Sequence, residues 1–421
     1  MSAPREAEIV ARLTALKRAA RALRALPSAA KDRALKAAAD GLEASKHAIL
    51  EANRQDLDAL PASATAAFRD RLGLDDRRLE QMAESLRQVA ALPDPVGELV
   101  ENRRLANGLK VSRIRSPLGV ILMVFESRPN VATEAFGLAF KAGNVAILRG
   151  GKESMRSTGQ LYEVLGRGLA EAGISKDVFW GITDPDRAIT EFLLKQRAFI
   201  DIVVPRGGDS LIEFVTENTR IPVIKNDRGL CHVYVHEDAD LDMAASIVAN
   251  AKCQRPGVCN SMETLLVHQK AAPELLKRLQ SLDVEWHADP RALQLLSASG
   301  GAKRARAATE KDWDTEYLDL ILNCRVVDSY EQALEHIELH GSRHSEAIIT
   351  RSRELSLRFQ EEVDAAAVYW NASTRFTDGF ELGLGGELGI STQKLHVRGP
   401  VGLRELTSVR WIIDGEGQVR T

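Results

Sequence analysis

The feature that most constrains the fold is a regular alternation of apolar runs and helical segments over residues 119–226. The apolar runs are GVILMVFE, NVAILRG, DVFWGIT, FIDIVVP and IPVIKN, and the segments between them carry apolar residues at helical spacing. Short, near-continuous apolar strands that alternate with helices are typical of a parallel sheet covered on both faces. We therefore predict an α/β fold with a doubly wound sheet, whose ligands bind beyond the carboxyl ends of the strands.

The parts of the chain on either side predict helices and a second α/β lobe. The first hundred residues are rich in Ala, Leu, Arg and Lys at helical spacing. Pro27 separates a first helix from a second that runs from Ala29 towards Leu60. The second lobe begins near Cys231, where HVYVHEDADLDMAASIVANA predicts a strand, a turn and a helix before the strand METLLVH.

Three other segments predict extended arms. Residues 104–116 alternate polar and apolar side chains after an Asn-Gly pair, which favours a hairpin. Residues 392–398 and 408–413 also have an extended pattern. Because arms of this kind commonly pair across a subunit boundary, we expect a homo-oligomer.

Composition excludes several classes of function. The chain has 56 Lys and Arg against 59 Asp and Glu, a formal charge of −3, so no strong field recruits nucleic acid or acidic lipid. No apolar run approaches the roughly 20 residues that cross a bilayer, and the opening MSAPREAEIVARL lacks a signal-peptide core. We expect no membrane span and a cytoplasmic location. The four cysteines lack paired CxxC spacing, which disfavours a disulfide framework and a zinc site.

Two glycine pairs each follow a predicted strand. A glycine turn lets backbone amides approach a phosphate, and a neighbouring cation suits a ribose phosphate. Neither pair is a GxGxxG fingerprint, and either one alone is equally consistent with a plain tight turn. Two such turns on one sheet favour a nucleotide. The residues are Arg149, Gly150, Gly151 and Lys152 in the first turn, and Arg206, Gly207 and Gly208 in the second.

Cys259 is the best candidate nucleophile. It follows a Pro-Gly turn in CQRPGVCNSMETLLVH, between a predicted helix and a predicted strand, where a thiol can be exposed yet held rigidly. The other cysteines fit the ordinary role of a buried apolar residue. His232 and Cys231 do not form a dyad, because adjacent strand residues point to opposite faces. Asn130 is placed to stabilise an oxyanion, although an Asn beside Pro129 equally fits a helix cap.

This layout resembles the aldehyde dehydrogenase superfamily and, within it, the family of gamma-glutamyl phosphate reductases. The resemblance is carried by SPLGVILMVFESRPNV, AILRGGKES, VVPRGGDSL, KCQRPGVCNSMETLLVH and WNASTRFTDGFELGLGGELGISTQKLHVRGPVGL, which extend over nearly the whole chain. It implies reduction of L-glutamyl 5-phosphate with NADPH to L-glutamate 5-semialdehyde and phosphate, in proline biosynthesis. It also implies glutamate 5-kinase as a candidate partner.

The resemblance further implies three parts with different tasks. Residues 1–103 and 117–229 would form an NADP-binding domain of Rossmann type, to which residues 363–391 return. Residues 230–362 would form the catalytic lobe that carries Cys259. Residues 104–116 and 392–421 would form a small β oligomerisation arm.

Particular residues take roles by the same resemblance. Cys259 would attack the acyl phosphate, with Asn130 and the Cys259 amide stabilising the oxyanion. The turns at 149–151 and 206–208 would hold NADP, preferring NADPH through the cation at Arg149, and Glu316 would lie near the nicotinamide ribose. Ser373 and Arg375 are the candidate ligands of the substrate carboxylate, although Arg375 equally fits a solvated surface. No metal is expected.

One departure favours reduction over oxidation. Hydrolytic members of the superfamily carry a Glu that activates water, and alignment of VIKNDRGLCHVY leaves Lys225 near that position. Without a general base, a thioester survives until hydride reaches it. Two rivals remain open: a hydrolytic semialdehyde dehydrogenase of the same fold, and a silent nucleotide-binding scaffold.

Overall fold

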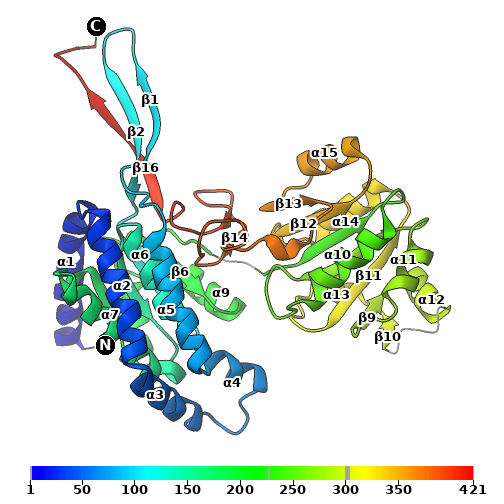
Figure 1. Ribbon diagram of the computed structural model, residues 1–421, viewed down its shortest axis with the longest axis horizontal. Coiled ribbons are helices and arrows are strands. Elements are labelled where there is room, and N and C mark those ends of the chain that lie inside the picture. Colours follow the sequence, from blue (N-terminus) through cyan, green and yellow to red (C-terminus); the bar gives the residue numbers. More distant parts are fainter. Residues whose placement is uncertain (1, 226–227, 299–303, 421) are drawn as a thin grey trace. The chain divides into compact units, whose positions relative to one another are not determined.

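The computed structural model describes residues 2–225, 228–298 and 304–420. The chain divides into two compact units (Figure 1). The first comprises Met1–Lys225, Gly383–Gly389 and Val401–Thr421, and the second comprises Asn226–Leu382 and Ile390–Pro400. None of the described helices is long and apolar enough to cross a membrane.

The first unit contains a four-stranded sheet, a three-stranded arm and the helices around them. Its helices are α1 (Ala3–Arg24), α2 (Ser28–Ala44), α3 (Lys46–Asp58), α4 (Ala66–Leu72), α5 (Asp76–Ala91), α6 (Asn130–Lys141), η1 (Lys152–Ser154), α7 (Met155–Glu171), η2 (Lys176–Val178), α8 (Arg187–Leu193) and α9 (Asp209–Asn218). Its strands are β1 (Leu99–Arg104), β2 (Lys110–Pro117), β3 (Val120–Phe125), β4 (Val145–Arg149), β5 (Phe179–Ile182), β6 (Ile202–Arg206) and β16 (Thr407–Asp414).

The four-stranded sheet has the order β5-β4-β3-β6, and all its strands are parallel. Every residue of the central strand β3 is buried, as the continuous apolar run predicts. The predicted strand IPVIKN is wrong, because only Val223 bridges to Val203. Pro222 has no N–H to donate and interrupts the ladder there. The last residue of that run, Asn226, lies outside the described residues.

The helical lead-in is confirmed, with one additional break. The helix predicted from Ala29 towards Leu60 is two helices, α2 and α3, which meet at Ser45. Ser45 leaves the helical conformation, and Ser and Gly, here Gly41, are weaker helix formers than the Ala and Leu around them. Helix α2 packs against α5, α6 and α7, so these helices form layers over the sheet.

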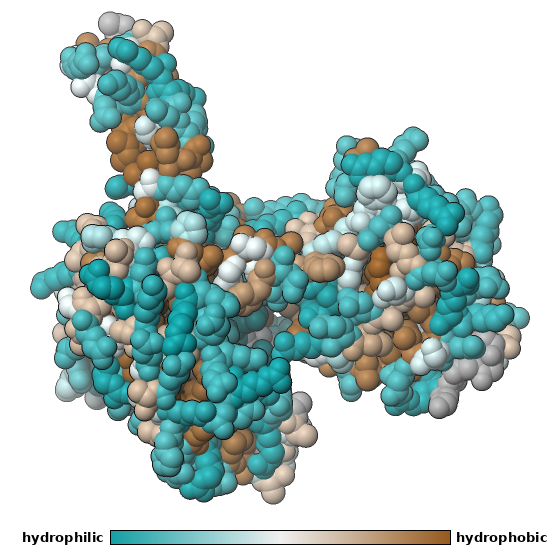
Figure 2. Space-filling model, in the orientation of Figure 1, coloured by the Kyte–Doolittle hydropathy of each residue, from teal (hydrophilic) through white to brown (hydrophobic). Residues whose placement is uncertain are grey.

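The arm is a three-stranded antiparallel sheet in the order β1-β2-β16. The hairpin predicted at 104–116 is confirmed, and Gly108 turns it with a φ of +91°. Hydrophobic residues lie exposed along the arm (Figure 2), among them Trp411 and Ile413. Residues 392–398, however, form no strand and belong to the second unit, where Lys394 pairs with Asp364. The predicted arm 392–421 is therefore too long.

The second unit is built on a seven-stranded sheet. Its helices are α10 (Leu241–Cys253), α11 (Ala272–Leu279), α12 (Pro290–Ala298), α13 (Glu310–Trp313), α14 (Tyr330–His340), α15 (Arg353–Glu362) and η3 (Thr374–Phe376). Its strands are β7 (Cys231–Val235), β8 (Met262–His268), β9 (Glu285–Ala288), β10 (Ala305–Ala307), β11 (Ile321–Val327), β12 (Ser345–Ile349), β13 (Ala367–Trp370), β14 (Ile390–Ser391) and β15 (Gly399–Pro400).

The large sheet has the order β10-β9-β11-β8-β7-β12-β13 and is parallel throughout. Val233 and Val235 belong to one buried cluster and Tyr234 to another, so both faces of the sheet are covered. The prediction that 363–391 return to the cofactor domain is wrong for residues 363–382 and 390–391, and only Gly383–Gly389 belong to the first unit. Strand β13 instead pairs with β12 and extends this sheet.

Candidate active site

In the first unit, three loops follow neighbouring parallel strands. Because β3 lies between β4 and β6, the turns after these three strands share the carboxyl edge of the sheet. The structure thus brings together both predicted glycine turns and the Glu126–Pro129 turn that leads to Asn130.

The two glycine turns pack closely on the turn after β3. A Cβ on Gly207 would lie 2.7 Å from the Glu126 carboxyl, and one on Gly151 would lie 2.4 Å from the Ser127 Oγ. The Glu126 Oε1 accepts a hydrogen bond of 2.8 Å from the Gly208 N–H. Sequence reasoning missed Glu126, although its place directly after the central strand was a usable signal. Close packing alone therefore means that a side chain at 151 or 207 would displace Ser127 or Glu126.

Arg149 is turned inward. Its guanidinium donates to the Gly150 and Pro185 carbonyls, and burial lowers the pKa of Arg149. Lys152, by contrast, is exposed, and no hydrogen bond or ion pair of its side chain is recorded in the described part of the chain. The exposed cation of this turn is thus Lys152 rather than Arg149.

Asn130 and Arg206 are half-buried at the same edge. The helix cap of α6 is Pro129, so Asn130 is a helical residue and not the cap. Its amide Nδ2 donates to the Glu134 Oε1 at 3.1 Å. Burial raises the pKa of Glu134, while the Asn130 hydrogen bond and the charge of Arg206 lower it. An amide held in this way has a defined orientation, which an oxyanion donor requires.

A pocket of about 430 Å³ lies elsewhere in the first unit. It is lined by α1 residues that include Lys17 and Arg21, and by Gly119 and Asp201. Gly119 directly precedes β3 and Asp201 directly precedes β6, so both lie at the amino edge of the sheet. The pocket is therefore separate from the glycine turns.

In the second unit, Cys259 is half-buried on the turn between α10 and β8. The neighbouring Asn260 fixes this turn, because its Nδ2 donates to the Thr377 carbonyl at 2.8 Å and its carbonyl accepts from the Thr374 Oγ1 at 2.7 Å. The Ser261 Oγ also donates to the Ala251 carbonyl at 3.2 Å. The turn thus presents a partly accessible thiol on a rigid backbone, as the sequence predicts.

Two of the remaining cysteines are less accessible than Cys259. Cys231 and Cys324 are fully buried and Cys253 is half-buried. Burial raises the pKa of each of these three thiols. The His232 Nδ1 lies 3.0 Å from the Glu346 Oε2. His232 therefore pairs with a carboxylate and forms no dyad with Cys231, as the sequence predicts.

Glu316 and Cys259 lie on either side of Gly229. The Gly229 N–H donates to the Glu316 Oε1 at 2.9 Å. A Cβ on Gly229 would lie only 1.7 Å from the Cys259 carbonyl oxygen, so only glycine fits there. Sequence reasoning missed Gly229, because a single glycine before a strand carries no sign of its distant neighbour. The geometry links a candidate ribose ligand to the backbone of the nucleophile.

Arg375 also contacts the nucleophile turn. Its Nε donates to the Gln254 Oε1 at 2.9 Å, and its carbonyl accepts from the Asn260 Nδ2 at 3.3 Å. Burial, and then the charge of Arg255, lower the pKa of Arg375. Ser373 is buried, and its hydroxyl accepts from the Arg375 N–H at the start of η3. Arg375 is thus a half-buried cation near Cys259, whereas the Ser373 hydroxyl has a structural partner.

No group of three or more His, Cys, Asp or Glu side chains suited to a metal ion occurs among residues 2–225, 228–298 and 304–420.

Comparisons with known proteins identify relatives of the chain. The sequence profile of the Aldehyde dehydrogenase family matches residues 1–290. The gamma-glutamyl phosphate reductase of Moorella thermoacetica is 50% identical over 403 residues, which cover 96% of each chain. That of Heliobacterium modesticaldum is 46% identical over 409 residues, covering 96% of this chain and 97% of the relative.

Solved structures agree with the sequence relatives. The crystal structure of a gamma-glutamyl phosphate reductase from Thermotoga maritima superposes with a TM-score of 0.93 at 40% identity, covering 98% of this chain and all of that one. An acetylating aldehyde dehydrogenase from Geobacillus thermoglucosidasius shares the fold, with a TM-score of 0.70 at 17% identity. These findings confirm the α/β aldehyde dehydrogenase-like fold. The chain belongs to the aldehyde dehydrogenase family and, within it, to the gamma-glutamyl phosphate reductases, oxidoreductases of proline biosynthesis.

Proposed function

We propose that the protein reduces L-glutamyl 5-phosphate with NADPH through a thioester on Cys259. The observation that carries the proposal is the Cys259 turn: a partly accessible thiol follows α10 and is fixed by Asn260 and Ser261. Family membership supports an acyl phosphate as the substrate. Acyl transfer to a thiol requires this combination of access and rigidity.

The Cys259 thiolate attacks the acyl carbon, and the C–O bond to phosphate then breaks, which leaves a thioester and inorganic phosphate. The Asn130 amide and the Cys259 N–H stabilise the oxyanion, and loss of one such donor typically costs about 2.7–4 kcal/mol in barrier. When bound, NADPH supplies the hydride that brings the acyl group to the aldehyde level. The C–S bond then breaks, which releases the aldehyde and restores the thiolate.

The carboxyl edge of the four-stranded sheet has a donor set that fits NADPH. Gly208 is the exposed N-cap residue of α9, and the N-terminus of a helix favours a phosphate. The carboxylates of Glu126 and Glu153 can accept hydrogen bonds from ribose hydroxyls. Lys152 supplies an exposed charge for a 2′-phosphate. An engineered glycolyl-CoA reductase of the same fold, 15% identical, carries bound NADP+.

Other residues complete the proposal. Arg375 takes the carboxylate of the substrate, because a guanidinium pairs with a carboxylate in a bidentate manner. Glu316 takes a ribose hydroxyl near the nicotinamide. Lys225 offers no general base for water, which favours reduction over hydrolysis of the thioester. The three-stranded arm pairs with a second copy of the chain, and a kinase such as glutamate 5-kinase supplies the labile acyl phosphate.

The reaction run backwards tests the proposal. L-Glutamate 5-semialdehyde, NADP+ and phosphate are mixed with the wild type, Cys259→Ser and Cys253→Ser. The wild type and Cys253→Ser should form NADPH only when phosphate is present, and Cys259→Ser should form none. NADPH formation without phosphate would indicate the hydrolytic rival. Substantial turnover by Cys259→Ser would refute the thioester.

A further inference from the structure

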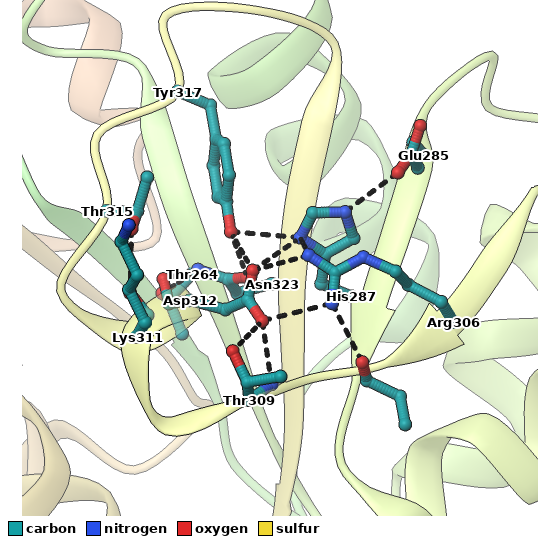
Figure 3. A network of polar contacts seen from close by, with 11 residues as sticks. Thr264, Glu285, His287, Arg306, Thr309, Lys311, Asp312, Thr315, Tyr317 and Asn323 are labelled. Carbon is teal, nitrogen blue, oxygen red and sulfur yellow. Dashed lines mark hydrogen bonds and ion pairs between the residues drawn. The ribbon is translucent and has the colours of Figure 1, made fainter.

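A polar network in the second unit surrounds the carboxylate of Asp312 (Figure 3). Arg306 donates to both carboxylate oxygens of Asp312, at 2.6 and 3.1 Å. The Tyr317 hydroxyl donates to its Oδ1 at 2.5 Å, and Thr309 donates to its Oδ2 through the backbone N–H and the hydroxyl, at 2.7 and 2.6 Å. The His287 ring packs edge-on against Tyr317, with 5.1 Å between ring centroids.

This network keeps Asp312 charged inside the protein. Asp312 is only 5% exposed. Burial raises its pKa, but the hydrogen bonds from Arg306, Thr309 and Tyr317 outweigh burial and hold the pKa of Asp312 well below its usual range. The Tyr317 hydroxyl therefore has a carboxylate partner, besides the His287 Nδ1 at 2.9 Å, and hydrogen bonds to charged groups are the stronger ones.

The residues on either side of Tyr317 point to other partners. Glu316 accepts from the Gly229 N–H at 2.9 Å, and the Leu318 N–H donates to the Glu263 Oε1 at 3.3 Å. Leu318 has a φ of +53°, a conformation that costs a residue with a side chain about 1 kcal/mol or more, and the residue is 42% exposed. Such a strained residue persists only where its neighbours hold it, and here those neighbours are Tyr317 and Glu263.

We propose that Tyr317 is a positioning residue that sets Glu316 against Gly229, and thereby against the backbone of Cys259, by its hydroxyl anchor on Asp312. The inference rests on the proposed role of Glu316 at the nicotinamide ribose. Tyr317 itself touches neither substrate nor cofactor in this proposal. Loss of its hydroxyl frees the segment that carries Glu316, while Asp312 keeps Arg306 and Thr309.

The test compares Tyr317→Phe with Tyr330→Phe. Tyr330 is a matched control in the same unit, because its hydroxyl also donates to a carboxylate, the Glu362 Oε2, at 2.8 Å. Both variants keep the aromatic ring, and both are assayed as phosphate-dependent reduction of NADP+. Tyr317→Phe should raise the KM for NADP+ about fivefold to tenfold with kcat within about twofold, as loss of a buried hydrogen bond to a charged group permits. Tyr330→Phe should match the wild type in both constants.

A second comparison separates positioning from general loss of structure. If Tyr317 acts through Glu316, then Tyr317→Phe added to Glu316→Gln should change the KM for NADP+ by less than about twofold. An unchanged KM for NADP+ in Tyr317→Phe overturns the inference. A KM in the double variant that rises by the product of the two single effects overturns it as well. An unchanged KM in Glu316→Gln overturns the ribose role of Glu316 and the inference together. The reductase chemistry is judged separately, by Cys259→Ser.

Discussion

Replacement of Gly229 by alanine should displace the nucleophile. The added Cβ would lie 1.7 Å from the Cys259 carbonyl oxygen, and ordinary contact begins at 3.4 Å, so this distance has to double. The hydrogen bonds of Asn260 and Ser261 hold the residues that follow Cys259. Because those residues cannot move away, we expect the added methyl group to displace Cys259 and its thiol. A misplacement of about 1 Å at a reacting group can cost about 100-fold, or about 2.7 kcal/mol in barrier. We expect a loss of that size in kcat/KM for Gly229→Ala.

Gly166→Ala is the matched control. Gly166 lies inside α7 with nothing within 4 Å of its would-be Cβ, so alanine there should keep full activity and slightly stabilise the helix. Three measurements are needed for both variants: kcat/KM in the phosphate-dependent direction, the rate of Cys259 alkylation, and Tm. If Gly229→Ala folds and keeps more than about a third of the wild-type kcat/KM, the reasoning is refuted. The Cys259 carbonyl oxygen would then have moved without displacing the Cys259 Sγ.

Three further outcomes are expected. Lys152→Ala should raise the KM for NADPH about tenfold and leave that for NADH unchanged, since only NADPH carries a 2′-phosphate for this cation; equal effects on both would contradict the assignment. Burial raises the pKa of Glu263 to about 7 from its ordinary value of 4.5, although the buried ion pair with Lys252 lowers it. The stabilisation by the protonated Glu263 carboxyl is therefore present below pH 4.5 and is lost as pH rises through 7. The Tm of the wild type minus that of Glu263→Gln should accordingly fall from about pH 5 to about pH 8, and a rise would contradict it. Ile413→Asp, at a residue 59% exposed on the arm, should reduce the mass measured by light scattering to that of one chain; an unchanged mass would contradict pairing through the arm.

The fold was predictable where burial follows a simple period. Strand β3 is a continuous apolar run, and a run of that kind has few alternatives to the centre of a parallel sheet. Prediction failed where a distant partner decides the outcome. Pro222 leaves a single bridge in place of a strand, and Asp364 ties Lys394 to the second unit although residues 392–398 have an extended pattern. Neither partner is visible in the local sequence.

The candidate site shows the same division. Cys259 was predictable because a Pro-Gly turn between a helix and a strand exposes its thiol locally, although the contacts that hold the turn rigid come from Thr374 and Thr377, more than 100 residues away. The orientation of Arg149 was not, since its guanidinium is bound by the carbonyl of Pro185, which is 36 residues away. Tyr317 was equally hidden, because its importance depends on a buried carboxylate that only folding brings under its hydroxyl.

A glycine in these turns can be needed for packing against a neighbouring side chain or for contact with the cofactor, and the sequence alone does not distinguish the two. Gly151 and Gly207 face the side chains of Ser127 and Glu126, so a larger residue at either position would displace these side chains even without a nucleotide. What the turns offer a cofactor comes from groups around these glycines, namely the N-terminus of α9 and the exposed charge of Lys152. Cofactor preference should consequently respond to substitution at Lys152, whereas substitution of Gly151 or Gly207 should first lower Tm. A variant of either glycine that loses NADPH binding at unchanged Tm would show that the backbone itself touches the cofactor.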